Sequence, residues 1–181
     1  MMRSEIITAL VRMLCPLGPG GNPEQREAEE AAWATRAAAD TRTMSELLEL
    51  ARNPPTTAER GRITEEAFQA QLAHVLAVAG AHAPAAALEQ LGPLTQDPRA
   101  RATAIEVIGA IGDPAGLRWL APSVDAGDLS DEEATWLASS LGDIGSAEAL
   151  RLLDRLAART AGERASVHRE IQIARDGIAR R

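Results

Sequence analysis

The sequence predicts an all-α fold, an α-solenoid of stacked antiparallel helix pairs, and three observations support it. Alanine makes up about a fifth of the 181 residues, and leucine is also abundant. Both are strong helix formers, whereas the aromatic and β-branched residues that favour strands are sparse, with one phenylalanine and no tyrosine. A segment also recurs 33 residues apart, as IGAIGDPAGLRWL from Ile108 and LGDIGSAEALRLL from Leu141. A fixed period of this length is typical of helical repeats.

The N-terminal part of the chain lacks this period. Helices are expected over residues 4–14, 23–39 and 45–52, with Asn22-Pro23 opening the second and Ser45 or Thr43 capping the third. Asn53-Pro54-Pro55 ends the third helix and is the best internal boundary, because a double proline cannot continue a helix. Residues 1–53 are therefore expected to form an irregular helical cap within a single domain of residues 1–181.

From Thr64 onward the punctuation predicts helix pairs. Asp-Pro dipeptides at 97–98 and 113–114 open two helices, and Ser130 with Glu133 forms the pattern of a capping box. Gly112 and Gly145 stand where a left-handed C-cap is expected. The expected helices cover residues 64–79, 83–91, 98–111, 114–123, 130–144, 146–158 and 162–181.

The buried face of these helices follows from matched positions in successive units. In the first helices we expect Leu76, Ile108, Leu141 and Ala174 to be buried, and Gly109 and Gly142 to let neighbouring helices approach closely. In the second helices the matched positions are Ala85, Leu88, Leu117, Leu120, Leu150 and Leu153.

The unit at residues 100–114, ARATAIEVIGAIGDP, resembles the HEAT-like repeats of the phycobilin-lyase type, which read approximately V-R-x-A-A-x-x-A-L-G-x-I-G-D-P. The next unit keeps LGDIG at 141–145, a degenerate earlier one keeps LAVAG at 76–80, and the resemblance covers roughly residues 64–181. It implies a right-handed superhelix whose second helices line the concave side, and it places Arg101 inside the stack. Members of the family mostly bind proteins, some attach bilins, and a HEAT-like glycosylase family excises damaged bases.

Charge and cysteine content narrow the class of protein. All 19 basic residues are arginine, yet the net charge is −7, which disfavours a general nucleic-acid binder. The single cysteine, Cys15, excludes an internal disulfide and fits a reducing compartment. No run approaches the ~18 apolar residues of a membrane span, and Glu5 and Arg12 interrupt the apolar N-terminal stretch. A cytoplasmic location is expected.

The candidate partner-binding residues lie on the second helices. Arg118 and Arg151 occupy equivalent positions of the two repeated segments, and an arginine row with a tryptophan edge can anchor an acidic peptide. The residues predicted to make the contact are Arg118, Trp119, Arg151 and Arg155. The alternative interpretation of the row, which Arg159 continues, is a solvated face that pairs locally with Glu148 and Asp154.

The sequence indicates no catalytic residue, no cofactor and no metal site. The acids of residues 125–133 lack the spacing of a calcium loop and fit the first turn of a helix. Neither Cys15 nor His74, His82 and His168 shows ligand or nucleophile spacing.

The preferred hypothesis is a non-enzymatic protein-interaction scaffold or adaptor. One alternative is a nucleic-acid-binding or base-processing protein that uses the eight arginines of residues 151–181. An aromatic cleft is not indicated, because Trp33, Trp119 and Trp136 are too scattered. Trp136 is expected in the core. A second is a bilin-lyase-like or chromophore-associated protein. Ile171, Ala174 and Ile178 further suggest an uncovered apolar stripe that could support a homo-oligomer.

Overall fold

The computed structural model describes residues 3–14, 23–160 and 164–181, which form α-helices, two short 3-10 helices and no strand. The all-α prediction is therefore confirmed for the part of the chain described. The chain divides into two compact units, Met1–Ala83 and Pro84–Arg181. The predicted boundary at residues 53–55 falls inside the first unit.

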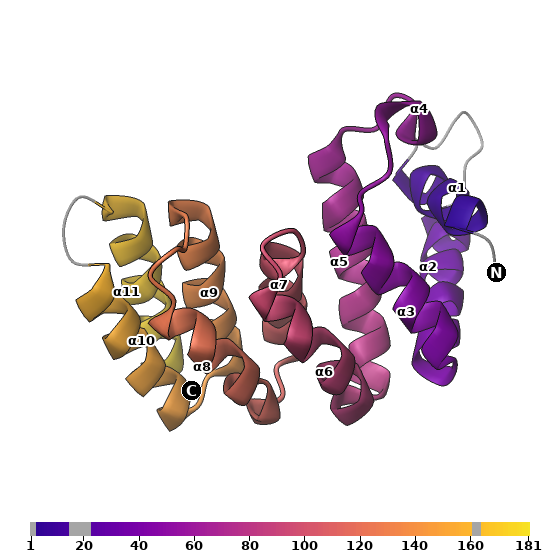
Figure 1. The fold of residues 1–181 in the computed structure, drawn as a ribbon. Coiled ribbons are helices and arrows are strands. Elements are labelled where there is room, and N and C mark those ends of the chain that lie inside the picture. Colours follow the sequence, from indigo (N-terminus) through magenta and orange to yellow (C-terminus); the bar gives the residue numbers. More distant parts are fainter. Residues whose placement is uncertain (1–2, 15–22, 161–163) are drawn as a thin grey trace. The chain divides into compact units, whose positions relative to one another are not determined.

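The first unit is organised around one long helix. Its elements are α1 (Arg3–Leu14), α2 (Pro23–Ala39), α3 (Thr41–Arg52), α4 (Thr57–Arg60) and α5 (Glu65–His82). Helix α5 packs against all four of the others (Figure 1). It begins at an N-cap, Thr64, whose side chain accepts a hydrogen bond from the Ala67 amide, and its Phe68 and Leu72 are fully buried.

Local signals at the ends of the first unit's helices differ from those predicted. Asp40, not Ser45 or Thr43, caps α3, because its carboxylate accepts hydrogen bonds from the Arg42 and Thr43 amides. The expected cap Asn22 lies outside the described residues. Helix α4 was not predicted, although Thr56 and Glu59 form a capping box there.

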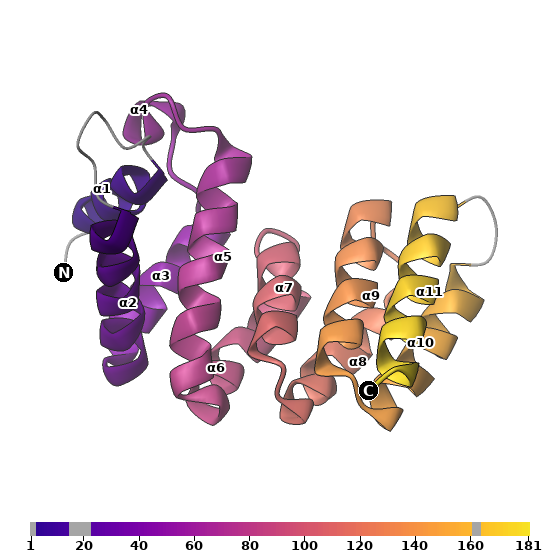
Figure 2. The ribbon, with the colours of Figure 1, turned by 180° about the vertical axis from the view of Figure 1, so that it is seen from behind.

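The second unit consists of α6 (Pro84–Leu91), η1 (Gly92–Gln96), α7 (Arg101–Ile111), η2 (Pro114–Gly116), α8 (Leu117–Asp125), α9 (Asp131–Ile144), α10 (Ala147–Arg159) and α11 (Ala165–Ala179). Helices α7 and α11 pack on α9, and Figure 2 shows the three side by side. Helix α10 packs on α8, α9 and α11. Figure 1 shows α8 and α10 on the near side of the layer formed by α7, α9 and α11. Ile108 of α7, Leu141 of α9, Leu120 of α8 and Leu153 of α10 are all fully buried.

The glycines of the repeated segment act as predicted. Gly112 and Gly145 end α7 and α9 with φ of 70° and 64°, the left-handed conformation of a C-cap. A Cβ on Gly109 would stand 2.4 Å from the Cβ of Ser140, and one on Gly142 would stand 2.9 Å from the Cβ of Ala174. Both glycines therefore set how closely α7, α9 and α11 approach one another. The capping box of Ser130 and Glu133 at the start of α9 is also confirmed.

Most predicted core positions are buried, including Leu76, Ile108 and Leu141 at 0% exposure. Ala85 is an error, because α6 starts at Pro84 and its first turn faces outward. Leu150 of α10 is only half-buried. Trp136 is also misplaced, since 37% of it is exposed on the surface of α9.

The C-terminal apolar stripe is not the uncovered face that the sequence suggested. Ile171 and Ala174 are buried at 1% and 6% exposure, because this stripe is the side of α11 that packs on α9. Ile178 is half-buried, and the exposed large apolar residue of α11 is Ile173.

Candidate functional site

Arg118 and Trp119 belong to a contact inside the second unit. The Arg118 guanidinium forms an ion pair with Glu89 of α6 and lies 5.0 Å from the centre of the Trp119 ring. That ring occupies the space beside Gly92 of η1, where a Cβ would stand 2.1 Å from it. Arg118 therefore presents a guanidinium that already has a carboxylate and an aromatic face.

The Trp119 indole leaves one polar group unsatisfied. Its Nε1 is buried and has no hydrogen-bond partner among the described residues. An orphaned indole N–H disfavours this packing, so the shape of the Gly92 backbone, not a hydrogen bond, holds the ring in place.

Arg155 and Arg159 of α10 share one acid of α8. Arg155 forms an ion pair with the Asp125 carboxylate, and the Arg159 Nε lies 3.6 Å from the other oxygen of the same group. Arg159 also donates from Nη1 to the Asp125 carbonyl oxygen at 2.7 Å. Since Asp125 ends α8, these contacts satisfy a carbonyl that the helix leaves open.

Arg151 differs from Arg118 and Arg155, because it is exposed and makes no ion pair or hydrogen bond with any described residue. Neither of its predicted local partners, Glu148 and Asp154, pairs with an arginine of the row. Asp154 accepts a hydrogen bond from Arg175 of α11 at 2.5 Å, and Glu148 pairs with no described arginine. The carboxylates that meet Arg118 and Arg155 come from the preceding second helix, not from their own helix.

The register of the repeated segments explains why Arg151 has no acidic partner. Glu89 precedes Arg118 by 29 residues, and Asp125 precedes Arg155 by 30. The residue 29 positions before Arg151 is Pro122, which carries no charge. The second copy of the repeated segment thus keeps the arginine, but a proline replaces the acid at the matching spacing. Spacings of about 30 residues between arginine and acid are a signal that sequence reasoning could have used.

The acidic segment 125–133 is neutralised by arginines from other helices. Arg101 is 7% exposed and lies 3.1 Å from the Asp128 carboxylate and 3.7 Å from that of Glu133. The Arg164 Nε lies 3.1 Å from Asp131. The expected position of Arg101 inside the stack agrees with this burial. Among the described residues, no group of three or more His, Cys, Asp or Glu could hold a metal ion.

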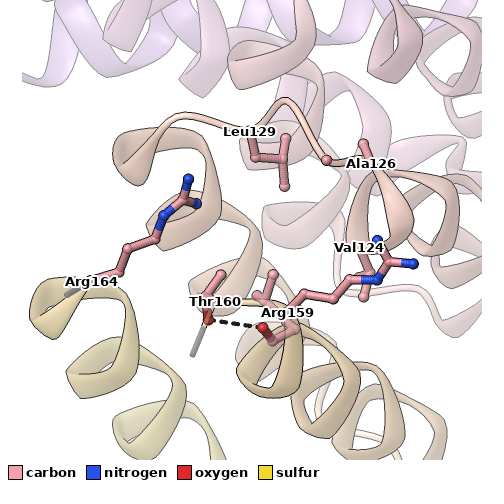
Figure 3. A pocket seen from close by; sticks show the side chains of 8 residues that line it. Val124, Ala126, Leu129, Arg159, Thr160 and Arg164 are labelled. Carbon is pink, nitrogen blue, oxygen red and sulfur yellow. Dashed lines mark hydrogen bonds between the residues drawn. The ribbon is translucent and has the colours of Figure 1, made fainter. Parts of the chain in front are cut away.

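The arginine row of Arg151, Arg155 and Arg159 leads to a cavity of about 450 Å³ in the second unit. Figure 3 shows the Arg159 and Arg164 side chains on opposite sides of it and Leu129 at its upper edge. Leu129, Val124 and Leu156 also line the cavity and are at most 6% exposed, so it combines apolar walls with two guanidinium groups at its rim. Thr160 turns inward, since its hydroxyl donates to the Leu156 carbonyl oxygen at 2.8 Å.

The histidines and the cysteine are not brought together with this surface. The His168 Nε2 lies 2.9 Å from the Thr160 carbonyl oxygen, and the His74 Nε2 lies 3.6 Å from the Glu30 carboxylate. His82 is exposed at the end of α5, and Cys15 lies outside the described residues.

The observed class is therefore an all-α protein whose second unit exposes an arginine row beside a cavity. Comparisons of the chain with protein-family models, with curated proteins and with solved structures find no match. Within the described ranges, no helix is both long enough and apolar enough to cross a membrane.

Proposed function

We propose that the chain is a non-enzymatic interaction module of the HEAT-like α-solenoid type, and that the arginine row of α10 binds an acidic segment of a partner protein. Three observations support the repeat assignment. Left-handed glycine caps recur at positions 112 and 145, close helix contacts recur at Gly109 and Gly142, and α7, α9 and α11 pack in series. Each helix pair of such a fold buries its apolar stripe against its neighbours.

The observation that carries the binding proposal is the missing acid opposite Arg151. Arg118 and Arg155 are each matched by a carboxylate from the previous second helix, whereas Pro122 stands where Arg151 would find one. A solvated arginine offers a planar fork of donors that fits a carboxylate in two parallel hydrogen bonds. Arg151 is thus the anchor, and Arg155, Arg118 and Trp119 flank it within a surface ordered by its own ion pairs.

The cavity beyond Arg159 extends this surface. An acidic segment that lies along α10 from Arg151 reaches Arg159 after two helical turns, since 151, 155 and 159 are spaced at i, i+4 and i+8. The apolar walls of Val124, Leu129 and Leu156 favour an aliphatic side chain at that end of the segment.

The distribution of acids favours a protein partner over nucleic acid. Arg155, Arg159, Arg164 and Arg175, half of the eight arginines of residues 151–181, each meet an aspartate of the same unit, which halves the number of guanidinium groups available for a phosphate backbone. No observation favours bilin attachment or base excision, and neither is proposed.

The test measures binding of a fluorescent acidic peptide, an alternating Glu-Leu decamer, to the purified chain by anisotropy. Arg151→Glu is expected to weaken binding by at least about tenfold, because it turns the anchor into a repelling charge. Arg169→Glu on α11 is the matched control, since Arg169 is also exposed and forms no ion pair or hydrogen bond with a described residue.

Equal binding by the parent chain and Arg151→Glu, with both folded by circular dichroism, would contradict the site. A labelled DNA duplex titrated over a salt series is the second arm. Steep salt dependence there, with no binding of the peptide, would favour the nucleic-acid alternative instead.

A further inference from the structure

The outer side of α11 carries a pattern that the arginine row does not use. Glu170, Ile173, Gly177 and Arg180 are spaced by three, four and three residues, so they share one side of the helix. All four line a groove of about 190 Å³ that Ser139 and Gly142 of α9 close on the other side. This surface is separate from the α10 row.

Ile173, which lines the groove, and Trp136 of α9 are the two large apolar side chains that the described residues expose most. Ile173 is 50% exposed, and Trp136 of α9 is 37% exposed. A Cβ on Gly177 would meet nothing within 4 Å, so the space above this glycine is open. Ile173 thus projects from this surface, and the open space above Gly177 can receive a side chain of the same kind.

The two charged residues of the pattern are available for an outside partner. Neither Glu170 nor Arg180 forms an ion pair or hydrogen bond through its side chain with a described residue. Two neighbouring charges of α11 are already engaged, because Arg175 pairs with Asp154 and Asp176 accepts a hydrogen bond from Gln172. Asp143 and Arg181 also line the groove, and they are joined by a hydrogen bond from the Arg181 Nη1 to the Asp143 carbonyl oxygen. Glu170 and Arg180 are thus the acid and the base of the groove whose side chains have no partner among the described residues.

The order of these residues is self-complementary. The positions 170 and 180 lie symmetrically about position 175, and so do 173 and 177. We infer that α11 mediates a two-fold homodimer, in which antiparallel copies of the helix place Glu170 opposite Arg180 and Ile173 over Gly177, each contact occurring twice. An isologous interface requires this kind of self-complementarity.

The size of the surface predicts the strength of the dimer. Helix α11 has 15 residues, which span about 22 Å at ~1.5 Å per residue. With α9 about 9 Å away, the two-helix face offers roughly 400 Å² per copy, below the ~1,200 Å² total of a stable interface. The dimer is therefore expected to be weak and concentration-dependent, since interfaces of this size belong to transient complexes.

The experiment is sedimentation velocity of the full chain from about 1 µM to about 500 µM, the concentration range in which a weak dimer dissociates. Glu170→Arg and Arg180→Glu are each expected to raise the dissociation constant at least about tenfold, because each creates two like-charge contacts across the two-fold axis. The double variant carrying both changes restores both ion pairs and is expected to dimerise within about threefold of the parent.

Gly177→Leu is a second, uncharged variant. Its side chain fills the space that receives Ile173, so we expect it to abolish the dimer while circular dichroism stays unchanged. Arg151→Glu is the control and leaves the dimer intact, since it lies on another helix. A parent chain that stays monomeric up to the highest concentration overturns the proposal, as does a double variant as weak as the two single ones.

Discussion

Arg101 lies buried on α7 with its Nη2 3.1 Å from the Asp128 carboxylate, which belongs to the segment that leads into α9. The same guanidinium lies 3.7 Å from Glu133, whose own carboxylate accepts a hydrogen bond from the Ser130 amide at the start of α9. One arginine thus links α7 to the N-terminal capping box of the next helix of the layer. Its 7% exposure means that packing of its stem contributes along with its charge.

Arg101→Ala is expected to lower the free energy of unfolding by about 2–3 kcal/mol, because it removes buried packing and leaves two acids without their base. Asp128→Asn is the control and should cost less than about 1 kcal/mol, since the Asp128 side chain is 65% exposed and can be hydrated. Urea unfolding followed by circular dichroism measures both. Equal losses would mean that the ion pair, and not the burial of Arg101, governs this contact.

Gly109→Ala tests the close approach of α7 and α9. Its Cβ would stand 2.6 Å from the Ser140 backbone Cα, so the helices must separate. Such overpacking costs about 1–3 kcal/mol, which exceeds the ~1 kcal/mol that alanine gains in helix propensity. Gly177→Ala, where a Cβ meets nothing, is expected to stabilise by about 0.5–1 kcal/mol. Thermal melts at low protein concentration should therefore shift in opposite directions.

The glycine positions and the helix caps were predictable because they depend on neighbours in sequence. Gly112, Gly145 and the Ser130 capping box all lie where the repeat and local hydrogen-bonding rules place them. Asp40 was missed because the helix it caps begins earlier than its apolar residues suggest. Tertiary packing likewise continues α5 through Gly80, which is buried, although glycine is a poor helix former.

The helix positions of the candidate arginines were predictable, but the acids that they meet were not. The row of arginines follows from the repeat, whereas the acids opposite Arg118 and Arg155 come from helices about 30 residues away. Such pairs depend on the register between helices, which periodicity alone does not reveal. The packing of Trp119 depends on the same register, since nothing in the sequence indicates that Gly92 makes room for its ring.

Glu106 on α7 is expected to give an unusual pH dependence. Burial raises the pKa of its carboxyl above the usual value of 4.5. The folded state therefore holds this proton more tightly than the unfolded state, and its contribution to stability falls as pH rises above 4.5. Glu106→Gln should stabilise the chain at pH 7 and lose this advantage near pH 4.

The exposed Glu132 provides the control for this prediction. It lies in the first turn of α9, where a negative charge is favourable, so Glu132→Gln should destabilise slightly at pH 7. Melting temperatures of the two variants and the parent between pH 4 and pH 7 make the comparison. A Glu106→Gln variant whose difference from the parent does not change with pH would argue against the raised pKa.

Asp40 should show the opposite dependence. Hydrogen bonds from the Thr43 side chain and the Arg42 amide lower the pKa of its carboxyl below 3.8. The cap therefore contributes fully above that value and is lost as pH falls through the lowered pKa. Asp40→Ala is expected to melt at a lower temperature than the parent at pH 7, with the difference shrinking in acid. Asp40→Asn, which keeps an acceptor, should retain most of the stability at both pH values.

Pro122 offers the sharpest test of why Arg151 is unpaired. It lies inside α8, where it cannot donate the backbone hydrogen bond to the Arg118 carbonyl oxygen. It also stands 29 residues before Arg151, the spacing at which Glu89 precedes Arg118. Pro122→Glu restores both the amide and the acid, whereas Pro122→Ala restores the amide alone. Both variants are expected to be more stable than the parent, because proline inside a helix costs about 3 kcal/mol.

The two variants should differ in binding. Pro122→Glu supplies an internal carboxylate that competes for Arg151, so binding of the Glu-Leu peptide should fall by about tenfold, a loss of ~1.4 kcal/mol. Pro122→Ala leaves Arg151 unpaired and should bind as the parent does. Anisotropy titrations at two salt concentrations measure this, since a contact between charges weakens with ionic strength. If both variants bind equally well, the carboxylate recognised by the chain meets some group other than Arg151.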